Sequence, residues 1–282
     1  MKKIIALMLA VLLLVGMTAC GAKKAADGSD LAYVKEKGKL VVGITDFAPM
    51  DYKDDAGNWI GFDADMAVAF AKDLGVECEF VEINWDTKIN ELDSKAIDAV
   101  WNGMTLTDEV KKGMETSNPY CNNAQVIVVK AEVAEEYAIA EACKALNFAV
   151  ESGSAGESAV AAKNFNYVPV TTQADALMEV SSGTSDACVI DLLMAGAMIG
   201  EGTSYENLTY TDSLTTEEYG VGFRKGSDLA AALNEFFVKA YADGSMMATA
   251  ESTAYRNPSS NRSKLVCNER IAAVPSGTAA IR

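Results

Sequence analysis

Short apolar runs and amphipathic segments alternate along the chain. A β-rich apolar run at 39–44 is followed by a turn, and apolar residues then recur at helical spacing over 62–74, where Gly75 ends the pattern. Strands that alternate with helices favour a mostly parallel sheet covered by helices. The other elements of this first α/β unit are predicted at 79–83, 88–94, 96–101 and 107–114.

The alternation restarts after a long apolar strand predicted at 124–130. A segment rich in Ala and Glu at 133–146 is predicted to be a helix, and a late strand at 219–224 leads into a helix at 230–242. Two α/β units are therefore predicted in series. The second unit comprises a strand at 148–150, a helix that ends at Lys163, a strand at 167–170, a helix at 174–181 and a strand at 186–191.

The N-terminal residues have the pattern of a targeting segment. Two lysines precede an apolar run at 4–15, which is shorter than the roughly 20 residues that span a bilayer, so residues 1–19 are predicted to be a signal peptide. Small residues stand directly before Cys20, as in a lipobox, and Cys20 would become the lipidated N-terminus; the alternative is ordinary secretory cleavage near Ala19. The small, polar stretch 20–30 is predicted to be a tether.

The composition excludes several classes of protein. Absence of histidine excludes Ser-His-Asp and Cys-His catalysis and HExxH zinc sites. The formal net charge of −16 repels phosphate backbones, which excludes nucleic-acid binding. Beyond Cys20 the cysteines show no CxxC spacing, so no metal site is expected and buried free thiols are favoured over disulfides. They are Cys78, Cys121, Cys143, Cys188 and Cys267.

Short fragments spread over residues 38–245 resemble the family 3 periplasmic-type solute-binding proteins, which deliver amino acids to ABC importers. The resemblance implies a two-lobed α/β fold of the periplasmic-binding-protein type II kind, with two crossover hinge strands. It also implies a monomer without cofactor that partners an ABC permease and its ATPase. The fragments are GITDFAP at 43–49, GFDADMA at 61–67, WD at 85–86, IDA at 97–99, GMTLTDE at 103–109, NPY at 118–120, VVK at 128–130, GVGFRK at 220–225 and DG at 243–244.

Lobe boundaries follow from where the β/α rhythm restarts and from the late strand that returns the chain. The first lobe is predicted to combine 31–126 with 219–282, and the second lobe to cover 131–215. The hinges are then expected at about 127–130 and 216–220. The segment from Asn257 onward is predicted to be irregular.

In the first lobe, the resemblance places ligand contacts at the carboxyl end of the first strand, where open α/β sheets bind ligands. These are Asp46 and Phe47, for which the alternative at Asp46 is a helix cap. Trp85 matches the aromatic residue that stacks on the ligand, with a core tryptophan as the alternative, and Tyr52 is a further aromatic candidate.

A second group of positions matches residues that bind the α-carboxylate and α-ammonium of the ligand. Asn102, Gly103 and Thr105 match the segment that receives the carboxylate near a helix N-terminus. In the second lobe, Ser154 and the preceding glycine match another anion-receiving turn. Glu151 matches a position that reads the ligand side chain, with a solvated strand-end acid as the alternative, and Asp191 matches the acid that binds the ammonium.

The sequence departs from the family at Val110. Relatives usually have arginine here, whose fork clamps the α-carboxylate in two parallel charge-assisted hydrogen bonds. Lys111 follows directly, but one residue along a helix points about 100° away. With acids and no arginine among the candidates, the site is expected to prefer a ligand with extra positive charge or one without an α-carboxylate.

Three functions compete. The first is a binding lipoprotein of an ABC importer for an amino acid or related amine, on the outer face of the membrane. The second is a receptor module that senses a ligand for a membrane partner. The third is a dehydratase that uses a pocket carboxyl as general acid, which the acidic pocket disfavours because prephenate-like substrates are multiply charged anions.

Overall fold

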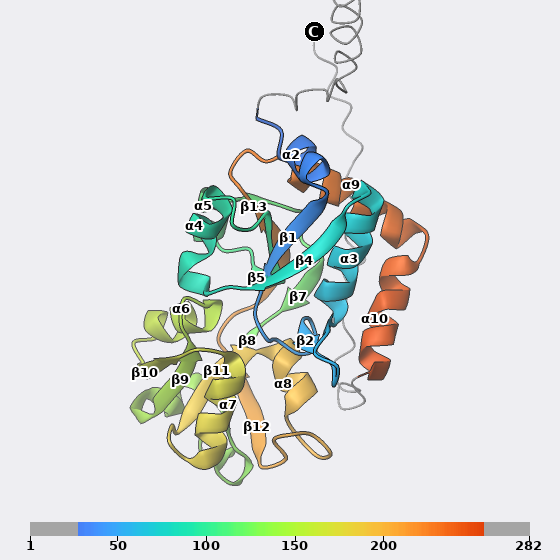
Figure 1. The fold of residues 1–282 in the computed structure, drawn as a ribbon. Helices are drawn as coiled ribbons and strands as arrows, with labels where there is room; N and C mark the ends of the chain where they lie inside the picture. The colour runs from blue at the N-terminus through green and yellow to red at the C-terminus, as the bar shows by residue number, and fades with distance from the viewer. Residues whose placement is uncertain (1–27, 257–282) are drawn as a thin grey trace, which may run out of the picture.

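The computed structural model describes residues 28–256 and divides them into two α/β lobes (Figure 1). Each lobe has its own sheet. The first lobe contains the sheet that begins with β1 (Lys39–Ile44), and the second lobe contains the sheet that begins with β8 (Gln125–Lys130). The predicted signal peptide, Cys20, most of the tether, Cys267 and the segment from Asn257 lie outside the described residues. No helix within 28–256 is long and apolar enough to cross a membrane.

The first lobe is built on a sheet in the order β4-β1-β5-β13-β6, with β7 also paired to β13. Strand β1 pairs in parallel with β4 and β5, whereas β13 runs antiparallel to β5. Helix α3 packs against β4 and β5, and α9 packs against β13. The strands are β1 (Lys39–Ile44), β4 (Glu77–Glu82), β5 (Ala99–Thr105), β6 (Glu115–Thr116), β7 (Cys121–Asn123) and β13 (Glu217–Phe223).

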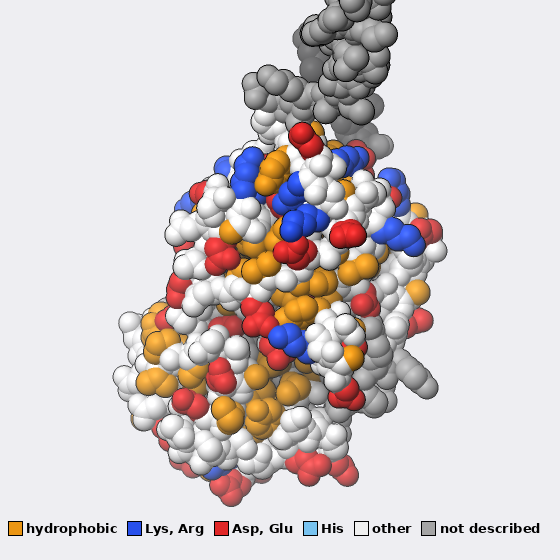
Figure 2. Space-filling view, viewed as in Figure 1, with side chains coloured by type: hydrophobic (Ala, Val, Ile, Leu, Met, Phe, Trp, Pro, Cys, Tyr) orange, Lys and Arg blue, Asp and Glu red, His pale blue; other side chains and the backbone are white. Residues whose placement is uncertain are grey.

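Other elements of this lobe surround that sheet. The helices are α2 (Asp30–Lys37), α3 (Phe62–Leu74), η2 (Trp85–Thr87), α4 (Lys88–Asp93), α5 (Asp108–Gly113), α9 (Leu229–Ala242) and α10 (Ser245–Arg256). A small hairpin pairs β2 (Tyr52–Lys53) with β3 (Trp59–Ile60). On the face in Figure 2, most basic side chains lie over this lobe and acidic ones are spread over both.

The second lobe has a sheet in the order β10-β9-β11-β8-β12. Strands β9, β10 and β11 are parallel, and β8 and β12 are antiparallel additions. Its strands are β8 (Gln125–Lys130), β9 (Asn147–Glu151), β10 (Asn166–Val170), β11 (Ala187–Asp191) and β12 (Leu208–Ser213), and its helices are η3 (Ala131–Val133), η4 (Ala140–Ala145), α6 (Ala155–Ala162), α7 (Gln173–Ser182) and α8 (Leu192–Met198).

The chain crosses between the sheets earlier than the sequence indicates. Residues 127–130, predicted as a hinge, lie within β8, which already pairs with β11 from Gln125 to Val129. The first crossover is instead the short step between β7 and β8, around Ala124. On the return, residues 217–219 already pair with β7 in the first sheet.

The predicted helix at 133–146 is wrong. The structure has two short 3-10 segments there, η3 and η4. The backbone N–H of Ala140 donates to the Asp212 carboxylate at 2.8 Å, and Cys143 and Leu146 pack into the core of the second lobe. These tertiary contacts override the helix propensity of the Ala- and Glu-rich segment.

The folded body begins within the stretch predicted as tether. Ser29 caps α2 by accepting a hydrogen bond from the Ala32 N–H, and the Asp30 carboxylate accepts from Arg224 Nε at 3.0 Å. Both residues therefore belong to the first lobe.

Candidate functional site

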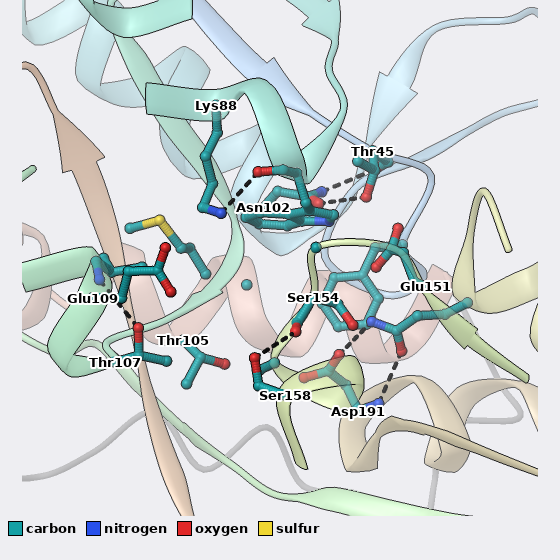
Figure 3. A pocket seen from close by; sticks show the side chains of 18 residues that line it. Thr45, Lys88, Asn102, Thr105, Thr107, Glu109, Glu151, Ser154, Ser158 and Asp191 are labelled. Carbon is teal, nitrogen blue, oxygen red and sulfur yellow. Dashed lines mark hydrogen bonds between the residues drawn. The ribbon is translucent and has the colours of Figure 1, made fainter. Parts of the chain in front are cut away.

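A pocket lies between the two lobes (Figure 3). Its walls come from loops and strand ends at the facing edges of both sheets, so a molecule inside it touches both lobes. Residues of the first lobe that line it are Thr45, Phe47, Trp85, Lys88, Asn102, Gly103, Met104, Thr105, Thr107, Glu109 and Val110. Residues of the second lobe are Glu151, Gly153, Ser154, Ala155, Ser158, Gln173 and Asp191.

Two of the predicted site residues do not line this pocket. The Asp46 side chain is exposed, whereas its neighbour Phe47 is buried and faces the pocket. Tyr52 lies in the β2–β3 hairpin, opposite Ile60. The structure brings the other predicted residues together, and their roles toward a ligand remain predictions: Phe47, Trp85, Asn102, Gly103, Thr105, Val110, Glu151, Ser154 and Asp191.

The pocket floor, formed by Thr45, Asn102, Gly103 and Thr105 of the first lobe, is fixed by a buried polar network. Asn102 Nδ2 donates to the Thr45 carbonyl at 2.9 Å and to Asp51 Oδ2 at 2.7 Å, and the Thr45 hydroxyl donates to Asn102 Oδ1 at 2.6 Å. The Asn102 amide therefore directs its donors into the first lobe.

Gly103 has a structural reason to be glycine. Its φ is +56°, and a Cβ there would lie 2.4 Å from the Phe47 ring. Its N–H donates to Asp63 Oδ2 at 2.7 Å. Burial raises the pKa of Asp63 to about 6, although the hydrogen bonds from Tyr120 and Gly103 oppose this rise.

Thr105 also has its hydroxyl occupied. Thr105 Oγ1 donates to Glu217 Oε1 at 2.9 Å. The Asn102 side-chain amide, the Gly103 N–H and the Thr105 hydroxyl are thus already donating to protein atoms.

Asp191 ends β11 at the centre of an amide and hydroxyl cluster. Its carboxylate accepts from Tyr219 at 2.6 Å, from Gln125 at 3.0 Å, and from the amides of Asn123 and Gln173. Burial, and then the negative charge of Glu217, raise the pKa of Asp191 to about 7, and the hydrogen bonds oppose this.

Glu151 is not the solvated strand-end acid of the alternative interpretation. Its side chain is only 3% exposed and lines the pocket. Burial, and then the charge of Asp191, raise its pKa to about 8, while the neighbouring Gln173 and Trp85 side chains lower it. Glu151 is therefore a largely protonated acid at neutral pH in this structure.

The tryptophans differ in placement. Trp85 lines the pocket from η2 and also packs against an apolar cluster of the first lobe, so its stacking on a ligand stays a prediction. Trp101, in β5, is 1% exposed and packs against Phe70 and Phe237. Of the described cysteines, Cys78, Cys143 and Cys188 are free thiols.

Lys88 was missed by sequence reasoning, which found acids but no arginine among the pocket candidates. It is the single basic residue lining this pocket among the described residues. Its ammonium donates to the Trp85 carbonyl at 2.8 Å and lies 5.7 Å from the centre of the Trp85 ring. Burial lowers the pKa of Lys88, while Glu109 and Asp86 raise it. The helical periodicity of the sequence indicates which residues lie on the same helix face as Lys88. It does not indicate that this face lines a pocket.

The other overlooked lining residues lie at helix starts and strand ends. They include Thr107, which caps α5 by accepting from the Val110 N–H at 3.1 Å, and Gln173, which begins α7 beside the Thr172 capping box. Among residues 28–256, no group of acidic and cysteine side chains is arranged to hold a metal ion. The other missed positions are Thr45, Met104, Glu109, Ala155 and Ser158.

Comparisons with known proteins agree with this architecture. Residues 40–252 match the bacterial extracellular solute-binding proteins, family 3. The L-cystine-binding protein TcyJ of Escherichia coli is 32% identical over 249 residues, which cover 86% of this chain and 91% of the relative. The glutamine-binding protein GlnH of Bacillus subtilis is 31% identical over 261 residues, covering 86% and 94%.

Solved structures give the same result. A mutant of ArgBP from T. maritima has a TM-score of 0.74 and 32% identity, covering 79% of this chain and 97% of that chain. An ancestral amino acid-binding protein, described as a precursor of cyclohexadienyl dehydratase, also has a TM-score of 0.74, with 33% identity and coverage of 79% and 99%. The chain belongs to the bacterial extracellular solute-binding proteins of family 3.

Proposed function

We propose that the protein captures an amino acid or a related amine between its lobes and delivers it to an ABC permease that is driven by a partner ATPase. The observation that carries this proposal is the inter-lobe pocket, lined by Glu109, Glu151, Asp191 and a single ammonium, that of Lys88. Small zwitterions and cations complement such a lining. Relatives named for cystine, glutamine and arginine binding support the amino-acid class.

Binding closes the lobes in this proposal. Trp85 and Lys88 belong to the first lobe and Glu151 and Asp191 to the second, so one ligand completes the contacts between them. The short crossovers flanking β8 and β13 allow hinge motion, as in periplasmic binding proteins. A ligand that contacts both walls shifts the equilibrium toward the closed form.

The protein acts in this proposal as a monomer held on the outer face of the membrane by lipid on Cys20. Among the described residues, the first lobe comprises about 28–123 and 217–256, and the second lobe about 125–213. The protein is not an enzyme. The raised pKa of Glu151 supplies a protonated acid, but the lining offers only the Lys88 ammonium to the multiply charged anions that a dehydratase of prephenate-like acids requires.

A thermal-shift screen tests the function. The ligand-free protein is heated with each common amino acid, with agmatine and other amines, and with prephenate. An amino acid or amine at 100 times its Kd stabilises the folded state by about 2.7 kcal/mol and raises the melting temperature. Asp191→Asn is the matched control, and the same compound should stabilise it less. Stabilisation by prephenate alone, with turnover, would replace the proposal by the dehydratase.

A further inference from the structure

A ligand carboxylate would find few unused donors on the pocket floor. The Asn102 amide donates to Thr45 and Asp51, the Gly103 N–H donates to Asp63, and the Thr105 hydroxyl donates to Glu217. Buried carboxylates are retained only where they are hydrogen-bonded or paired with a cation. A carboxylate in this pocket therefore requires a donor from elsewhere in the lining.

The position where relatives carry the clamping arginine supplies no donor. Val110 is 6% exposed and packs with Met104 and Met114, while its N–H donates to the Thr107 hydroxyl. An apolar side chain thus fills this part of the pocket wall.

Lys88 enters the pocket from the helix next to Val110. Helices α4 and α5 pack closely, since a Cβ on Gly113 would lie 2.7 Å from Ile89 Cδ1. Trp85, three residues before Lys88, and Ile89, directly after it, pack against the apolar cluster that contains Val110. Figure 3 shows Lys88 and Glu109 reaching in on one side of the pocket, with Glu151 and Asp191 on the other.

The Lys88 ammonium is only partly used within the protein. An ammonium has three donors, and one of them is bonded to the Trp85 carbonyl. None of the ion pairs within residues 28–256 includes Lys88. The charges of Glu109 and Asp86 offset part of the cost of burying this cation, and a bound carboxylate would offset more of it.

We infer that Lys88 binds the carboxylate of the ligand, in place of the arginine that Val110 replaces. The inference rests on the proposed function, because it needs a ligand with a carboxylate. An ammonium is a compact point charge on a flexible stem, whereas a guanidinium is a rigid fork. Lys88 therefore holds the carboxylate through fewer hydrogen bonds of fixed geometry than an arginine would. The site is then less selective for the orientation of the carboxylate than an arginine site.

Paired ligands with and without the carboxylate test the inference. The probes are L-arginine with agmatine, L-histidine with histamine, and L-cystine with cystamine, each titrated by calorimetry into wild type, Lys88→Met and Lys88→Arg. Loss of a charge-assisted hydrogen bond predicts that Lys88→Met weakens the bound amino acid about ten- to a hundredfold. The matching amine should bind no more weakly, and Lys88→Arg should retain the amino acid. Lys111→Met is the control, since Lys111 is exposed on α5 and does not line the pocket.

A second variant separates a lost carboxylate contact from a disturbed fold. Lys88→Met combined with Val110→Arg should recover part of the lost affinity for the amino acid and should not strengthen binding of the amine. Equal loss for amino acid and amine in Lys88→Met, or no loss in either, would overturn the inference and leave the proposed function standing. If wild type binds none of the amino acids, the proposed function fails and the inference fails with it.

Discussion

The Ser152 hydroxyl donates a 2.9 Å hydrogen bond to the Asp86 carboxylate, and this bond joins the two lobes beside the pocket. Asp86 follows Trp85 in η2, and Ser152 follows Glu151 at the end of β9, so the bond ties together two pocket walls. The next residue, Gly153, has a φ of +71° and leaves no room for a side chain: a Cβ there would lie 2.8 Å from the Asp86 backbone nitrogen. The contact between the lobes therefore depends on glycine.

Gly153→Ala should weaken ligand binding by at least tenfold. The left-handed conformation costs an alanine about 1–2 kcal/mol, and the methyl group prevents the approach of Asp86 that closure requires. Gly57→Ala is the matched control, because Gly57 has a φ of +83° but no atom within 4 Å of its added Cβ. Calorimetry should show normal affinity for this control. Equal affinity in both variants would show that the Asp86 contact does not limit closure.

Ligand binding should change the fluorescence of Trp85. This side chain lines the pocket, whereas Trp101 is buried in the first lobe and should report little. Small-angle scattering should show a smaller radius of gyration with ligand, and Trp85→Phe should remove most of the fluorescence change. Unchanged dimensions with a saturating tight ligand would contradict hinge closure.

Glu151 should make the stability of the ligand-free protein depend on pH. Its pKa rises from 4.5 to about 8 on folding, so the folded state binds the proton more tightly than the unfolded state does. The contribution is present below pH 4.5 and is lost as pH rises toward 8, so the free energy of unfolding should fall across this window. Urea titrations of wild type and Glu151→Gln should show a flatter profile in the variant. A ligand cation placed beside Glu151 would favour the carboxylate, so binding at pH 7 should release protons.

The first strand and the first long helix of the first lobe were predictable because local pattern and packing agree there. The strand at Lys39–Ile44 and the helix at Phe62–Leu74 have the predicted bounds, and Gly75 ends that helix in the left-handed conformation. At 133–146, tertiary contacts at Ala140 and Cys143 prevail over helix propensity.

The site was harder to predict, since it depends on how elements pack. Asp46 and Phe47 are adjacent, and the residue that turns inward is the phenylalanine. Lys88 faces the pocket only because α4 packs beside α5, which no local pattern indicates.

Arg224→Leu should destabilise the first lobe by about 3–5 kcal/mol. Arg224 is 8% exposed, and its guanidinium donates to Asp30 at 3.0 Å and to Asp98 at 3.2 Å. Removing it leaves Asp30 without this cation, and Asp98 keeps only Lys37 and the Val41 N–H as partners. Lys239→Ala breaks the exposed pair with Asp73 and should change stability by less than about 1 kcal/mol. Urea unfolding measures both, and similar effects would mean that the Arg224 network is no stronger than a surface pair.

Val110→Arg alone should weaken ligand binding. With Lys88 already in the pocket, a guanidinium from the neighbouring helix adds a second cation at the same wall, and the two repel each other. The arginine also inserts a long polar chain into the cluster of Met104 and Met114, and it repels any cationic group of the ligand. Val110→Met keeps the wall apolar and should retain affinity, so calorimetry on the two variants separates charge from volume. Tighter binding by Val110→Arg would mean that no cation of the wild-type protein contacts the ligand carboxylate next to Val110. Lys88 would then not be its binding partner.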